Sequence, residues 1–298
     1  MKFEPSKIFI GYISAIIAAA LFGSVSTLAK PILSSINPIV MSGLIYIIAG
    51  LALSPIQANV KFIFSKKYFM LVLISAVAGA AVAPSIFFLG LKQTTASNTA
   101  LLANGETVFS ILFALVIFKE RLRPLGYISL VFVLVGLFIV STDFKLDTSI
   151  FRWDSGNLLI ITSTIIWGLD NNIGRLILRR INVSRFIQLK SLIGGSMLLV
   201  TILILNVPLE LALDQILPII TLGVFGFALS LYLYLHSIIR IGVVKSSLIL
   251  SLSAVFGLVF ATVFLAEPVS IFQLIAITIM LFGIYMMYTM ENNIVSHA

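Results

Sequence analysis

Ten stretches of apolar residues, each long enough to cross a lipid bilayer, constrain this chain more than any other feature. Reading them between polar breaks gives 8–29, 36–54, 68–91, 97–118, 124–141, 156–174, 184–205, 215–238, 244–265 and 269–289. A hydrocarbon layer of about 30 Å is spanned by roughly 20 helical residues. Only 10% of the residues are charged, against about 25% in soluble domains. The pattern predicts an all-α integral membrane protein with ten transmembrane helices.

The composition excludes several kinds of chemistry. The chain has no cysteine, which removes disulfides, thiol nucleophiles, iron–sulfur clusters and thiolate zinc sites. Its two histidines, His236 and His297, are too few for a multi-histidine metal centre. The net charge of +8 comes without a dense Lys/Arg tract, so basic cytoplasmic loops explain it better than nucleic acid does. With no GxxxxGK[ST] loop for ATP, we expect no cofactor, no metal and no nucleic-acid partner.

The distribution of Lys and Arg predicts the orientation in the membrane. With the N-terminus inside, 14 of the 19 basic residues fall on the cytoplasmic side and 4 on the outer side, while Lys190 lies within a span. An even number of spans returns the C-terminus to the starting side. The positive-inside rule therefore predicts a multi-pass protein of the cytoplasmic membrane with both termini in the cytoplasm.

An internal repeat divides the chain into residues 1–148 and 149–298. A shift of 147 positions lays residues 97–141 on 244–288 without a gap, and 10 of the 45 pairs are identical. Near the start of each half, Phe22-Gly23 matches Trp167-Gly168 at a shift of 145. Each unit then holds five spans, and because five is odd the second unit enters the membrane from the opposite side. Inverted five-helix repeats of this kind build secondary transporters that work by alternating access.

Two segments resemble a known family. The stretch TTASNTALLANGETVFSILFALVIFKERL (94–122) looks like the end of the fourth span in EamA-type members of the drug/metabolite transporter superfamily, and residues 246–287 look like the corresponding ninth and tenth spans. The most specific parts are the helix-end residues Glu120 and Glu267 and the glycines Gly136 and Gly283. The resemblance implies a ten-helix carrier that moves small metabolites, often outward.

Glu106 is an acid near the middle of the fourth span. A central acid costs about 2.5–3.5 kcal/mol on the insertion scale, while the Leu, Ile, Phe and Val residues of 97–118 together return roughly 3–7 kcal/mol. The span can therefore insert, most easily with the acid protonated. Thr99, Glu106 and Ser110 share one helical face, which suits a cavity wall. We expect Glu106 to bind substrate or a proton; the alternative is a structural group hydrogen-bonded between helices.

A second polar group lies in the sixth span, in TIIWGLDNNIGR. Trp167, Asp170 and Asn171 share a face with Gly174. The face offers a ring for stacking, an anion and an amide, so it is a second candidate for substrate binding. The alternative is an interfacial acid paired with Arg175 or Lys190.

A weaker candidate is His236, which shares a helical face with Tyr232 near the inner end of the eighth span. A role in substrate or proton binding competes with simple packing of a hydrogen-bonded histidine.

These observations together predict a secondary carrier that exports small polar metabolites such as amino acids. Its expected partners are that substrate, a proton and the lipid bilayer. Export of lipophilic cations is the nearest alternative. A nucleotide-sugar carrier would need basic residues in the cavity, and Lys190 is the one candidate inside a span. An intramembrane enzyme would need a catalytic pair such as His236 with Asp170. A receptor role is disfavoured by short loops, and a homodimer is compatible with the sequence.

Overall fold

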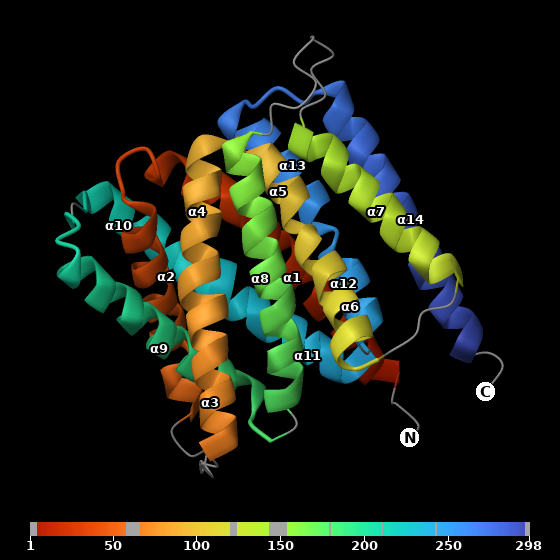
Figure 1. Ribbon diagram of the computed structural model, residues 1–298, viewed down its shortest axis with the longest axis horizontal. Helices are drawn as coiled ribbons and strands as arrows, with labels where there is room; N and C mark the ends of the chain where they lie inside the picture. Colours follow the sequence, from red (N-terminus) through yellow and green to blue (C-terminus); the bar gives the residue numbers. More distant parts are fainter. Residues whose placement is uncertain are drawn as a thin grey trace.

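The computed structural model describes residues 5–57, 66–119, 124–142, 154–178, 180–209, 211–241 and 243–295. Within these ranges the regular structure is helical throughout, with no strand. Figure 1 shows the helices side by side as a bundle, and the start of α1 and the end of α14 lie at the same end of it.

The first half of the chain contains α1 (Pro5–Ile32), α2 (Pro38–Ala52), η1 (Ser54–Gln57), α3 (Lys66–Ser75), η2 (Ala76–Val82), α4 (Ala83–Gln93), α5 (Ala96–Ala103), α6 (Gly105–Ile117) and α7 (Pro124–Thr142). The second half contains α8 (Ser155–Ile177), α9 (Val183–Ile204), α10 (Leu213–Thr221), η3 (Leu222–Leu229), α11 (Ser230–Ile241), α12 (Val243–Leu250), α13 (Ser253–Leu265) and α14 (Ile271–Val295). The segments η2 and η3 are π-helical and join their neighbours into single long rods.

Eight of the ten predicted spans correspond to a helix or to such a rod, and the other two, the fourth and the ninth, each correspond to two consecutive helices. Among the described residues, 5 helices are long and apolar enough to cross a membrane alone, and shorter apolar helices accompany them. The multi-pass, all-helical class is therefore confirmed. Helices begin at Pro38 and Pro124, because a missing N–H costs nothing in a first turn. The last helix begins at Ile271, after Pro268, where Ser270 and Gln273 cap each other.

Equivalent elements recur at a nearly constant spacing. α3 begins at Lys66 and α10 at Leu213, and α7 begins at Pro124 and α14 at Ile271, so both pairs are offset by 147 residues. The two π-helical segments also occupy equivalent places in their halves. The repeat seen in the sequence is therefore a repeat of structure. Its predicted boundary at residues 148 and 149 lies outside the described residues.

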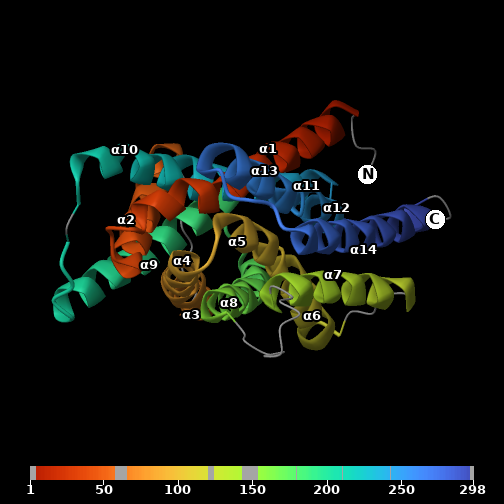
Figure 2. The same ribbon diagram turned by 90° about the horizontal axis from the view of Figure 1, so that it is seen from above.

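The two halves pack on each other in matching ways. A Cβ on Gly136 would approach the backbone oxygen of Ala276, and a Cβ on Gly283 would approach that of Ser129, which precedes Ala276 by 147 residues. These glycines let α7 and α14 lie close together, as Figure 2 shows at one end of the molecule. At the other end α2 and α9 form the corresponding pair.

The fourth and ninth spans are each interrupted near the centre. α5 gives way to α6 at Asn104, and α12 gives way to α13 after Leu250. The Nδ2 of Asn104 donates to the backbone oxygen of Ser251 at 3.2 Å, and the two residues are 147 positions apart. Equivalent positions of the two halves therefore meet at the breaks, and polar groups released by the interruptions satisfy one another.

Candidate functional site

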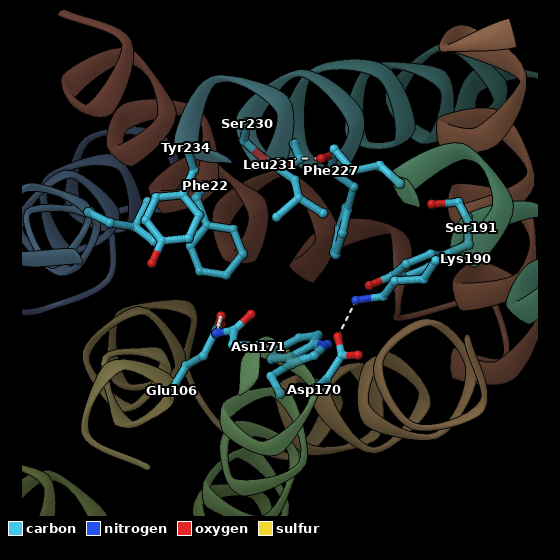
Figure 3. A pocket seen from close by; sticks show the side chains of 15 residues that line it. Phe22, Glu106, Asp170, Asn171, Lys190, Ser191, Phe227, Ser230, Leu231 and Tyr234 are labelled. Atoms are coloured by element: carbon cyan, nitrogen blue, oxygen red, sulfur yellow. Dashed lines mark hydrogen bonds and ion pairs between the residues drawn. The ribbon is translucent and has the colours of Figure 1, made fainter. Parts of the chain in front are cut away.

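A cavity lies between the two halves and is lined by both. The lining residues come from α1, α2 and α6 of the first half and from α8, α9, η3, α11 and α12 of the second half. Its free volume of about 70 Å³ has room for roughly five water molecules. Figure 3 shows Glu106 and Asn171 at one side and the pair of Asp170 and Lys190 at the other.

The carboxylate of Glu106 meets the amide of Asn171. Asn171 lies on α8 and its Nδ2 donates to Oε1 of Glu106 at 2.8 Å. Both side chains are half-buried and both line the cavity. Among the described residues nothing donates a hydrogen bond to the second oxygen, Oε2. Glu106 therefore has an acceptor oxygen ready for a solute or a proton, while Asn171 fixes the direction of the carboxylate.

Asp170 and Lys190 form a buried ion pair between α8 and α9. Nζ of Lys190 contacts Oδ2 of Asp170, and the hydroxyl of Ser75 donates to Oδ1. Asp170 is 2% exposed and Lys190 7% exposed, so each charge depends on the other for stabilisation. The structure thus selects Lys190 from the two basic partners that the sequence offered for Asp170.

Two aromatic side chains are held on one backbone carbonyl in the π-helical segment η2. The hydroxyl of Tyr46 donates to the oxygen of Gly79 at 3.0 Å, and Nε1 of Trp167 donates to the same oxygen at 2.9 Å. In a π-helix the donor for this oxygen would lie five residues on, but that residue is Pro84, which has no N–H. The proline therefore frees a carbonyl that orients Tyr46 and Trp167 at the cavity.

Gly79 also leaves room for the ion pair. A Cβ at this position would overlap the carboxylate of Asp170 and lie 2.7 Å from Nζ of Lys190. No other residue type leaves the pair undisturbed, so the glycine positions η2 directly against it.

Apolar and aromatic side chains complete the wall. They are Phe22, Tyr46, Trp167, Ile187, Phe227, Leu231, Tyr234 and Leu250. In Figure 3 the rings of Phe22 and Tyr234 lie across the cavity from Glu106 and Asn171. A solute in this space would meet a carboxylate on one side and aromatic side chains on the other.

The structure brings together four of the eight side chains that the sequence suggested, namely Glu106, Asp170, Asn171 and Trp167. The remaining four, which are Thr99, Ser110, Tyr232 and His236, are not among the residues that line the cavity. Thr99 is fully buried and donates to the oxygen of Thr95. Ser110 accepts from Asn172, which joins α6 to α8.

His236 and Tyr232 interact with each other away from the cavity. Their ring centroids are 4.4 Å apart, and Nδ1 of His236 lies 2.9 Å from Nη1 of Arg240. The histidine is not paired with Asp170, whose partners are Ser75 and Lys190. The geometry thus matches the packing interpretation of this histidine.

The sequence offered Lys190 only as an alternative partner of Asp170 or a base for a different carrier, and it did not single out Tyr46 or Ser75. The sequence did contain a signal for Lys190, because a lone base inside an apolar span is expected either to pair with an acid or to line a pathway for solutes or protons. Tyr46 and Ser75 gave no such signal, since tyrosine and serine are common in packed membrane helices. Within the described residues no group of three or more His, Cys, Asp or Glu is placed to hold a metal ion.

Hydrogen bonds join the two halves at one end of the bundle, between α5 and the segment from Glu267 to Gln273. Both carboxylate oxygens of Glu267 accept from α5, from the N–H of Ala96 at 2.8 Å and that of Ser97 at 2.9 Å. Nε2 of Gln273 donates to Oδ1 of Asn98 at 2.6 Å. The sequence had suggested Glu267 as a signal for the end of its own helix, whereas the structure uses it to cap a helix of the other half. Its repeat partner Glu120 lies outside the described residues.

The chain was compared with known proteins. The sequence model of the EamA-like transporter family matches it twice, over residues 9–142 and 154–289. An uncharacterised transporter of Methanothermobacter thermautotrophicus is 31% identical over 93% of this chain and 86% of its own length. An uncharacterised transporter of Clostridium kluyveri is 23% identical over 94% of this chain and 93% of its own length. A crystal structure with 18% identity superposes with a TM-score of 0.68 and covers 97% of this chain and 98% of the other; at that identity it supports the fold alone.

Proposed function

Because the chain belongs to the EamA-like transporter family, we propose that it is a secondary carrier that exports small polar metabolites bearing an amino group, such as amino acids and related compounds. The observation that carries this proposal is the cavity between the halves, into which Glu106, Asn171 and the Asp170–Lys190 pair project. Charged side chains inside a membrane protein are expensive and typically mark a pathway for solutes or protons. An ammonium group would bind at the free carboxylate oxygen of Glu106.

Alternating access is the mechanism that the packing supports best. α5 packs against α13, whereas the equivalent pair, α12 and α6, makes little contact among the described residues. Two halves of matching fold can exchange these arrangements, so that one end of the cavity closes as the other opens. In the proposed orientation, with both termini cytoplasmic, the end joined at Glu267 faces outward and is the one we infer to be closed. A reporter fused after Ala298 should therefore remain cytoplasmic, and an external signal would contradict this orientation.

The other candidate functions find less support. An intramembrane enzyme would need a reacting pair, and the pairing of His236 with Asp170 is absent from the described contacts. A nucleotide-sugar carrier needs bases for phosphate, and Lys190 is the one base among the described lining residues and is held by Asp170.

The test is flux into and out of proteoliposomes that contain the purified protein. A panel of amino acids, amines and nucleotide sugars would be offered with and without a pH gradient, with protein-free liposomes as the control. We expect amine-bearing solutes to cross the membrane only when the protein is present. Their flux should be faster when the proton gradient is directed opposite to the movement of the solute. Absence of flux for every solute, from a protein that still unfolds cooperatively, would count against a carrier.

A further inference from the structure

The charges that line the cavity do not cancel. Among the described lining residues Glu106 and Asp170 are acids and Lys190 is the single base, so the formal charge with both acids ionised is −2 + 1 = −1. Tyr46 and Tyr234 also face this space and add no charge at neutral pH. The cavity is therefore balanced either by one positive charge on a solute or by one proton on an acid.

The two acids are not equivalent. Asp170 has Ser75 on one oxygen and Lys190 on the other and is almost fully buried. Glu106 has one amide donor, Asn171, and faces the cavity. A solute can therefore reach the carboxylate of Glu106 without breaking an existing ion pair.

The single base is already engaged. Lys190 is 7% exposed, its ammonium contacts Asp170, and the same ammonium nitrogen lies 5.8 Å from the centroid of the Phe186 ring. A solute carboxylate could use this ammonium only by taking it from Asp170, which would leave that acid buried without its countercharge. Among the described lining residues the cavity thus offers a free charged partner for a cation and, in this arrangement, no free charged partner for an anion.

Aromatic side chains stand opposite the available carboxylate. Phe22 of α1 and Tyr234 of α11 lie across from Glu106 in Figure 3, and Phe227 and Leu231 extend the apolar wall. The negative face of an aromatic ring attracts an ammonium group, and the ring also packs against an apolar body.

We infer that the cavity selects organic monocations, meaning an ammonium group on an apolar or aromatic body, over zwitterions of the same size. This inference rests on the proposed carrier function and narrows its substrate class from amino-group metabolites in general, amino acids included, to those without a free carboxylate. It predicts that masking or removing the carboxylate of an amino acid improves recognition, because the solute then supplies the one positive charge that the cavity lacks and brings no unpaired negative charge.

The test compares three probes on the wild-type protein in proteoliposomes. Phenethylamine and phenylalanine differ by the carboxylate, and phenylalanine methyl ester keeps the bulk of that group without its charge. We expect the amine and the ester to compete for flux at least tenfold more effectively than phenylalanine. If phenylalanine is the most effective competitor, or if the ester competes no better than phenylalanine, the inference is overturned while a carrier stays in place. If no probe crosses the membrane, the carrier function itself is refuted.

Two variants separate the charge of the site from general effects on folding. Glu106→Gln keeps the size of the side chain and should lose at least tenfold in flux of the amine. Thr162→Val on α8 is the matched control, because Thr162 is exposed and donates within its own helix, to Leu158. Equal amine flux in Glu106→Gln and the control would contradict the assignment of Glu106 as the cation site, and the wild-type competition decides the substrate class independently of either variant.

Discussion

Removing Lys190 should destabilise the protein because it leaves Asp170 buried without its countercharge. The two side chains are 7% and 2% exposed. Breaking a buried pair by deleting one partner typically costs about 3–5 kcal/mol. Ser75 still donates to the carboxylate in Lys190→Met, which places the expected loss toward the lower end, at about 3 kcal/mol. At about 2 °C for each kcal/mol, the melting temperature should fall by roughly 6 °C.

The assay is a double-mutant cycle followed by thermal unfolding of the detergent-solubilised protein, with intrinsic tryptophan fluorescence as the signal. Lys190→Met and Asp170→Leu should each lower the melting temperature. Because replacing a buried pair by apolar groups of similar size is often neutral, the double variant should recover most of the loss and melt above Lys190→Met. Simple additivity of the two single losses would refute the argument, since it would mean that neither charge stabilises the other in the folded protein.

Three further predictions follow from the site and the closed end. Glu106→Gln should abolish the dependence of flux on a pH gradient while the protein remains folded; unchanged proton-linked flux would show that another group carries the proton. Gly79→Ala should displace the carboxylate of Asp170 and lower flux severalfold, and wild-type flux would mean that η2 shifts without cost. Glu267→Gln removes one of the two hydrogen bonds that the side chain accepts from α5. In the double variant Glu267→Gln, Ser97→Cys, an impermeant maleimide should therefore label the cysteine faster than in Ser97→Cys alone. Equal labelling rates would show that Glu267 does not hold this end together.

The absence of cysteine from the natural chain makes such labelling unusually direct. No background thiol has to be removed, so an introduced cysteine reports one position. The same property allows cysteine pairs across α5 and α13 to be compared with pairs across α6 and α12, which the alternating-access proposal expects to respond oppositely to substrate.

The sequence alone determined the positions and approximate ends of the ten apolar spans, although not the breaks within the fourth and ninth. The bilayer fixes the length of an apolar span and local rules fix its start, as at Pro38 and Pro124. The repeat was also readable, because equivalent positions such as Gly136 and Gly283 must be small wherever two helices approach closely. Glu106 could also be singled out from the sequence, since an acid is costly in a lipid-facing span.

Tertiary structure alone decided which side chains meet. The rotation of each helix about its axis and the choice of its neighbours depend on packing across the whole bundle, which no local pattern encodes. Lys190 could have faced several helices, and packing aims it at Asp170. Glu267 meets Ala96, which is 171 positions away, and His236 turns toward Arg240 and not toward the cavity. Hydropathy specifies that a residue lies in the membrane, whereas lateral packing specifies what it touches there.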